Sequence, residues 1–231
     1  MKNGVVTLAI LVCIPGIISC TAFDNNKPGE SPSVARENKK TYAANKKAVK
    51  KSTKKKPGNE IKGKTYGTRN RANQVKIYAE QKGYSTKYCF LVNMSLPSGR
   101  NRFFVYDLEK NSVVYSGLVA HGSCNETFIS HPRFSNANGS GCSSLGKYKV
   151  GAFYHGKYGK SFRLHGLENA NSNAYARAVV IHAYYCVPDE EIYPRVLCNS
   201  FGCPMVSQSF FNRLSRIIGS SEKPVLLWIY K

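Results

Sequence analysis

Short runs of apolar residues, separated by polar and glycine-containing segments, dominate the chain from about residue 100 onward. Such runs, when rich in β-branched and aromatic residues, are typical of β-strands. The runs cover residues 102–108, 113–120, 148–154, 161–165, 178–182 and 225–230. Lys110-Asn111 separates the first two runs and predicts a hairpin turn there.

Two other segments show the period of an amphipathic helix. The first covers residues 69–81, and Gly83 is placed to end it. The second follows Ser207, a favourable N-cap residue, and Gly219 is placed after it. The apolar positions are Ala72, Val75, Tyr78 and Ala79 in the first helix and Phe210, Leu214, Ile217 and Ile218 in the second. Many strands with one or two helices predict a mainly β (α+β) domain over residues 68–231.

Residues 1–19 have the layout of an export signal. Lys2 gives a positive start, and an apolar run that is too short to span a bilayer comfortably follows it. Ser19-Cys20 resembles the lipobox of bacterial lipoproteins, which implies cleavage before Cys20 and lipidation of its sulfur. Diacylation would anchor the protein stably to a membrane. An ordinary signal peptide with a chance cysteine is the alternative.

Positive charge is concentrated ahead of the predicted domain. The chain carries a net charge of +21, and residues 27–76 hold 16 Lys/Arg against 3 Glu. The linker 20–67 has few large aliphatic residues, so we expect it to be disordered and extended by charge repulsion. It would bind anionic polymers or lipid headgroups, or act as a solvated spacer without a partner. We expect no nucleic-acid partner, because an exported protein rarely meets one.

A cysteine and a histidine stand where nucleophilic chemistry could use them. His182 closes a predicted strand, and about twenty residues later Cys203 lies in the turn Ser200-Phe201-Gly202-Cys203-Pro204. An attacking sulfur needs a base, and the base must be oriented by a third group. A Gly-containing turn presents backbone N–H groups to a developing oxyanion. The spacing alone does not decide the matter, since many chains carry such a pair.

A longer series of motifs is more specific. In order, these are Phe104-Val105-Tyr106-Asp107-Leu108, Val119-Ala120-His121-Gly122, Phe134-Ser135-Asn136, Gly139-Ser140, Ser143-Ser144-Leu145-Gly146-Lys147-Tyr148, Tyr154-His155-Gly156, Phe162-Arg163-Leu164-His165-Gly166-Leu167-Glu168, Arg177-Ala178-Val179-Val180-Ile181-His182 and Ser200-Phe201-Gly202-Cys203-Pro204. With them the chain resembles, from about residue 71 to its end, the murein L,D-transpeptidase catalytic-domain family in its YkuD-like branch. The resemblance implies a YkuD-like β-sandwich with one or two packed helices.

The resemblance also implies a role for each site residue. Cys203 would be the nucleophile and His182 its general base, oriented by the carbonyl of Ala183. The N–H groups of Gly202 and Cys203 would line the oxyanion hole, and Ser200 would shape the turn. His121 and Arg163 lie in shared motifs and are candidates for lining the cleft, although structural hydrogen bonding is the preferred interpretation.

The implied substrate is a peptidoglycan stem peptide. The thiolate would attack the carbonyl of an L-centre, release the terminal D-amino acid and leave a thioester. An amine from a neighbouring stem would then form a cross-link, whereas water would make the enzyme an L,D-carboxypeptidase. No cofactor is required. The alternatives are a non-catalytic wall-binding lipoprotein and a cysteine peptidase acting on proteins.

Three positions depart from the family pattern. Phe201 stands where many members have histidine, Cys198-Asn199 replaces Gly-Arg, and Ala183 replaces Gly after the base. These departures bear on catalytic strength and substrate contacts, while the sulfur and the base are both present.

The remaining cysteines permit disulfides in an oxidising compartment. Our expected pairs are Cys124–Cys142 and Cys186–Cys198, with Cys89 buried and free, and other connectivities stay open. No Cys-x-x-Cys spacing supports a metal site. By analogy with other lipoproteins, Thr21 favours the outer membrane over the inner, with the domain facing the periplasm.

Overall fold

The computed structural model of the protein describes residues 60–231, with side chains from residue 67 onward. The predicted signal peptide 1–19, the lipidated Cys20 and nearly all of the basic linker 20–67 lie outside the described residues. No helix in the described part of the chain is both long and apolar enough to cross a membrane.

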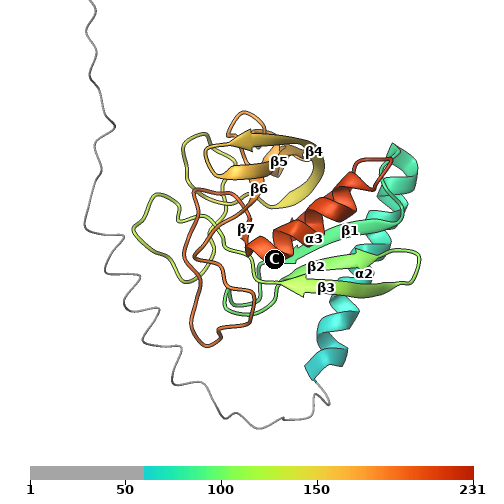
Figure 1. The fold of residues 1–231 in the computed structure, drawn as a ribbon, viewed down its shortest axis with the longest axis horizontal. Helices are drawn as coiled ribbons and strands as arrows, with labels where there is room; N and C mark the ends of the chain where they lie inside the picture. The colour runs from blue at the N-terminus through green and yellow to red at the C-terminus, as the bar shows by residue number, and fades with distance from the viewer. Residues whose placement is uncertain (1–59) are drawn as a thin grey trace, which may run out of the picture. The chain divides into compact units, whose positions relative to one another are not determined.

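One mixed sheet of eight strands forms the framework, in the order β3-β2-β1-β8-β4-β5-β6-β7 (Figure 1). The pairs β1–β8 and β6–β7 are parallel, and the other pairs are antiparallel. The strands are β1 (Tyr88–Asn93), β2 (Phe103–Asp107), β3 (Ser112–Gly117), β4 (Gly146–Gly156), β5 (Gly159–Gly166), β6 (Val180–Ala183), β7 (Met205–Val206) and β8 (Leu226–Tyr230). The predicted mainly β class is confirmed.

The central strands β1 and β8 are buried on both faces. Alternate residues of a strand point to opposite sides of a sheet. Accordingly, Phe90 and Leu227 enter one apolar cluster, whereas Leu91 and Trp228 enter another. Helix α2 (Glu60–Lys82) covers the second cluster with its small residues Ala72, Val75 and Ala79, all fully buried.

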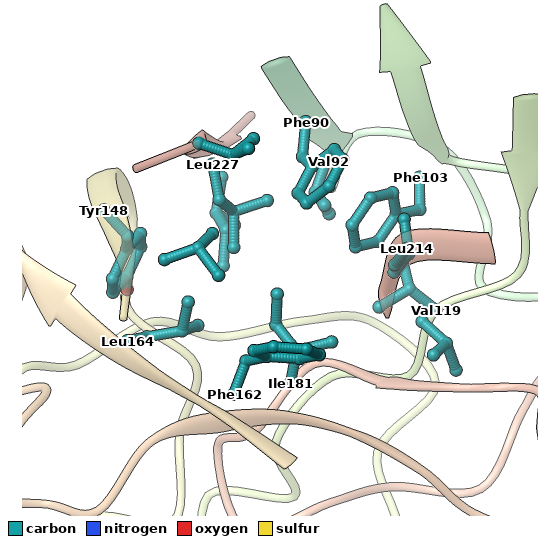
Figure 2. Close-up of a cluster of buried hydrophobic side chains, with 14 of the residues drawn as sticks. Phe90, Val92, Phe103, Val119, Tyr148, Phe162, Leu164, Ile181, Leu214 and Leu227 are labelled. Atoms are coloured by element: carbon teal, nitrogen blue, oxygen red, sulfur yellow. The ribbon is translucent and has the colours of Figure 1, made fainter. Parts of the chain in front are cut away.

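The first cluster joins the two halves of the sheet. Figure 2 shows Phe90 and Phe103 on one side of it, facing Phe162 and Ile181 on the other. In the β4–β5 pair the register shifts between Val150 and Phe153, and such irregularities bend a strand. The sheet therefore packs against itself in the manner of a sandwich, as the fold-class prediction expected.

Helix α3 (Gln208–Gly219) supplies the rest of this cluster through Phe210, Phe211 and Leu214. The hydroxyl of Ser207 accepts a hydrogen bond from the Phe210 N–H, which is the N-cap that the sequence predicts. Because α3 directly follows β7, its packing fixes the short strand that follows the reactive turn.

Some boundaries differ from the predictions. Strands β1 and β7 were not predicted, because the apolar run of β1 is short and β7 has only two residues. Helix α2 already begins at Glu60, so residues 60–67 of the predicted linker belong to a helix whose apolar period starts only at Ala72. Gly83 has a φ of 74° and follows α2 as predicted, whereas Gly219 is the last residue of α3 rather than the residue after it.

Candidate active site

His182 lies in β6, between β5 and the short strand β7. Its side chain is only 1% exposed, and its Nδ1 lies 3.1 Å from the carbonyl oxygen of Ala183. A carbonyl oxygen can only accept, so Nδ1 carries the proton in this hydrogen bond. The other ring nitrogen, Nε2, is then left as an acceptor, which is the arrangement that a general base requires.

Aromatic rings hold the imidazole in place. Tyr158 stacks on it at a centroid distance of 4.6 Å, and Tyr184 meets it edge-on at 6.2 Å. Burial lowers the pKa of His182 below its ordinary value, although the hydrogen bond to Ala183 acts in the opposite direction. The ring is therefore neutral near pH 7 and able to take a proton.

Cys203 lies two residues before the start of β7. Because β6 and β7 are parallel and His182 pairs with Met205, the residues just before Met205 run alongside the residues just before His182, and Cys203 lies near the backbone of Val180. Neighbouring strands lie about 4.8 Å apart. Cys203 is a half-buried free thiol, and its Sγ lies 4.0 Å from the carbonyl oxygen of Ala178.

Burial also raises the pKa of the Cys203 thiol. A backbone hydrogen bond at Val180 and the positive charge of Arg177 act in the opposite direction. With the pKa of the thiol raised and that of His182 lowered, the resting site holds a protonated thiol and a neutral imidazole, with no hydrogen bond between the two side chains in the described part of the chain. The proton would then move to His182 as the sulfur attacks.

Hydrogen bonds to the backbone of neighbouring loops and to the Ser143 side chain hold the turn of Cys203 in place. The Ser200 N–H donates to the His121 carbonyl, and the Ser123 N–H donates to the Ser200 carbonyl, both at 2.8 Å. The Ser143 hydroxyl donates to the Gly202 carbonyl at 3.2 Å. The sulfur is thus presented by a turn whose position is fixed by the neighbouring loops.

Ser200 also engages one of the two implied oxyanion donors. The Gly202 N–H donates to the Ser200 hydroxyl at 3.1 Å, so in this structure it is not free. Within residues 60–231, the Cys203 N–H donates to no acceptor. The Cys203 N–H is therefore the donor that is available for an oxyanion, and Ser200 shapes the turn as the resemblance implied.

Gly202 lets the nucleophile turn pass close to the Cys142 carbonyl, which a side chain at this position would prevent. Its φ is 110°, and a Cβ at this position would lie 2.7 Å from the Cys142 carbonyl oxygen. We expect Gly202→Ala to displace the turn and to lower kcat/KM by about tenfold or more, because misplacement of a reacting group costs rate steeply. Gly159→Ala is the control, since Gly159 has a φ of 75° but open space around it. Steady-state kinetics of both variants tests this, and unchanged kinetics in Gly202→Ala would contradict it.

Both expected disulfides, Cys124–Cys142 and Cys186–Cys198, are present. Cys142 contacts the nucleophile turn through its carbonyl, and Cys186–Cys198 closes the loop between base and nucleophile. Cys89 is buried and free, and burial raises the pKa of its thiol. Within the described residues, Cys203 is thus the free thiol that reaches the surface.

His121 lies in the interior and does not line the cleft surface. It is fully buried, and its Nδ1 lies 2.9 Å from Nη2 of Arg102, which is itself fully buried. Burial, with the charge of Arg102 adding to it, lowers the pKa of His121 to about 4. Its role is structural, because its carbonyl holds the Ser200 N–H.

Arg163, the other cleft candidate, lies on β5. Its guanidinium stacks over the rings of Tyr154 and Tyr175, at 4.6 and 5.4 Å from their centroids. No contact links Arg163 to Cys203 or His182 in the described part of the chain, so the structure does not bring it together with the reactive pair.

Arg177 was missed as a site residue. It immediately precedes Ala178, whose carbonyl is near the sulfur, and its charge acts on Cys203. In the sequence it is one basic residue among many, and no spacing rule marks it. Its contacts identify it only once the fold brings residues 135–144 beside it.

Two hollows flank the reactive pair. One, of about 320 Å³, lies on the histidine side and includes Ala183, Tyr184 and Asp189. The other, of about 330 Å³, lies on the cysteine side and includes Arg177 and Phe201. In residues 60–231, no group of three or more His, Cys, Asp or Glu side chains could hold a metal ion.

Comparison with known proteins identifies one family for this chain. The family described as L,D-transpeptidase catalytic domain matches residues 60–230. Among solved structures, a mutant of the helical cell shape determining protein Pgp2 from Campylobacter jejuni is 13% identical, with a TM-score of 0.42, over 64% of this chain and 48% of that one. An L,D-transpeptidase from Xylanimonas cellulosilytica is 14% identical, with a TM-score of 0.36, over 66% of this chain and 68% of that one.

A third structure, the Ldtfm–avibactam carbamoyl enzyme, is 13% identical, with a TM-score of 0.36, over 63% of this chain and 49% of that one. The chain therefore spans about half the length of this structure and of Pgp2. No curated protein sequence matches the chain.

Proposed function

We propose that this chain, which belongs to the L,D-transpeptidase catalytic domain family, is an active cysteine transpeptidase of peptidoglycan. The observation that carries the proposal is that a neutral, oriented His182 pairs with Met205 of the parallel strand β7, two residues after the accessible free thiol of Cys203. A family fold without activity would not need this arrangement.

The chemistry proceeds in two steps. The Cys203 sulfur attacks the carbonyl of an L-centre in the donor stem while Nε2 of His182 accepts its proton. The Cys203 N–H donates to the developing oxyanion. The C–N bond then breaks, the D-amino acid leaves with the proton from His182, and a thioester remains. An amine of a second stem attacks the thioester, His182 accepts the amine's proton, and the thiol is regenerated as the cross-link forms.

Product masses test the proposal directly. The purified full chain is incubated with stem tetrapeptides and with disaccharide-linked stems, and products are identified by mass spectrometry. Transpeptidation gives a dimer that lacks one D-amino acid, whereas L,D-carboxypeptidase activity gives a tripeptide and a free D-amino acid. Absence of both products would overturn the assignment and favour a non-catalytic wall-binding role. Cleavage of an all-L peptide would instead indicate a protein peptidase.

The leading segment supports a second, separable part of the proposal. The layout of residues 1–19 and the Ser19-Cys20 pair support export and lipidation, with anchoring at the periplasmic side of the outer membrane. The basic linker would bind anionic polymers or lipid headgroups. The mass of the mature N-terminal peptide tests the anchor, because an unmodified Cys20 would exclude it.

A further inference from the structure

Arg177 carries a charge that no acidic residue neutralises. Its Nη1 donates to the Ser135 carbonyl at 2.8 Å and to the Ser144 hydroxyl at 2.6 Å, and its Nη2 donates to the Cys142 carbonyl. All three partners are neutral, and Arg177 forms no ion pair within residues 60–231. A partly buried cation held in this way attracts an anion from outside the chain.

The position of this charge is set relative to the nucleophile. The residue after it, Ala178, has its carbonyl oxygen 4.0 Å from the Cys203 sulfur. A Cβ on Gly202, the residue before the nucleophile, would lie 3.1 Å from Nη2 of Arg177. The guanidinium therefore lies directly beside the turn that would hold the scissile carbonyl.

Arg177 also lines a hollow of about 330 Å³, in which its guanidinium is the charged group. The other lining residues are Asn125, Asn138, Gly139, Gly141, Ala176 and Phe201. No carboxylate lies among these lining residues, so a bound anion would meet no repulsion from them. Arg177 is therefore the lining residue that could hold a small anion in this hollow.

Two donors of the guanidinium remain for a ligand. Arginine has five N–H donors, and three of those of Arg177 are used by the contacts above. The remaining pair, the Nε–H and one Nη2–H, matches the two oxygens of a carboxylate.

We propose, on the basis of the function proposed above, that Arg177 binds the free α-carboxylate of the terminal D-amino acid of the donor stem. That carboxylate is one Cα away from the amide nitrogen that leaves, so its binding group must lie beside the nucleophile, where Arg177 is. A D-residue followed by another residue would present a neutral amide instead. Arg177 thereby selects stems that end at the leaving D-amino acid, and it takes no part in bond making or proton transfer.

The test compares two donors with the purified full chain. One is a stem tetrapeptide with a free terminal carboxylate, and the other is the same peptide with a terminal carboxamide. Release of the D-amino acid, or of its amide, gives kcat/KM for each. We expect the wild type to prefer the free acid by about 10- to 100-fold, the range for a charge-assisted hydrogen-bonded pair.

Variants test whether Arg177 is responsible for the preference for a free terminal carboxylate. Arg177→Gln is expected to reduce the ratio of the two kcat/KM values to near one, and this ratio is insensitive to a general loss of activity from loosening residues 135–144. Arg163→Gln is the matched control and should keep the wild-type ratio, because its guanidinium rests on Tyr154 and Tyr175. Should Arg177→Gln fail to fold, Arg177→Lys, which lacks the two-pronged geometry, should retain only part of the preference.

The outcomes separate the two proposals. Equal turnover of both donors by the wild type would overturn the role of Arg177 and leave the transpeptidase assignment intact. An unchanged ratio in the foldable Arg177 variant would do the same. If the wild type releases nothing from either donor, the proposed function fails, and the inference that rests on it fails with it.

Discussion

We expect Cys203→Ala to abolish covalent labelling of the domain and to lower acyl transfer by about 10³-fold or more, because it removes the accessible free thiol of the described residues. The full chain is treated with a thiol-reactive probe or a carbapenem, and the adduct is located by peptide mass. Peptide mapping is needed because the full chain also contains Cys13 and Cys20, which lie outside the described residues and carry thiols that the probe could label. Product formation from stem peptides is measured in parallel.

Cys89→Ala serves as the control for this prediction. Cys89 is fully buried and burial raises the pKa of its thiol, so its loss should leave labelling and turnover close to those of the wild type. An adduct that still maps to the 199–204 peptide of the Cys203→Ala protein would contradict the assignment of the nucleophile.

His182→Gln is expected to lower kcat/KM by about 10²- to 10⁴-fold, since the amide cannot accept the proton of the thiol. In the wild type, burial lowers the pKa of His182, so the imidazole is in its basic, neutral form throughout the neutral range. Protonation removes the base, and activity therefore falls as the pH drops. The acid limb of kcat/KM should lie below the ordinary histidine value of about 6.5.

A pH profile of the variant completes this test. The residual activity of His182→Gln should lack that acid limb, whereas His155→Gln, which alters an exposed histidine on β4, should keep both the rate and the profile. A wild-type acid limb that persists unchanged in His182→Gln would show that another group is the base.

Elements could be predicted where their residue types mark them. β2 was located from its aromatic and β-branched residues and α3 from its helical period, and Ser207 fixed the start of α3. The fully buried β8 was located from an unbroken run of large apolar residues, whereas the apolar run of β1 is shorter and was not identified. Residues 60–67 of α2 lack the apolar period that marks its packed part.

The site residues could be predicted where the residue type and the surrounding motif indicate the chemistry. Cys203 and His182 were predicted from the motif series, whereas the parallel β6–β7 pairing that aligns their segments is encoded by no local pattern. A shared motif alone does not distinguish a cleft residue from a buried one, and His121 lies buried beside Arg102, in keeping with the preferred structural interpretation. Arg177 could be recognised as a site residue only from its contacts with residues 135–144, which lie far from it in the sequence.

The Cys186–Cys198 disulfide closes a loop over residues 187–197. Val187 and Leu197 of this loop are buried in one apolar cluster with Met205 of β7, so changes at these two positions would reach the strand that follows the nucleophile. Exposed loop positions such as Glu190 are not part of that packing. Natural selection, or an engineer, can therefore diversify the exposed face of the loop while its buried residues stay fixed.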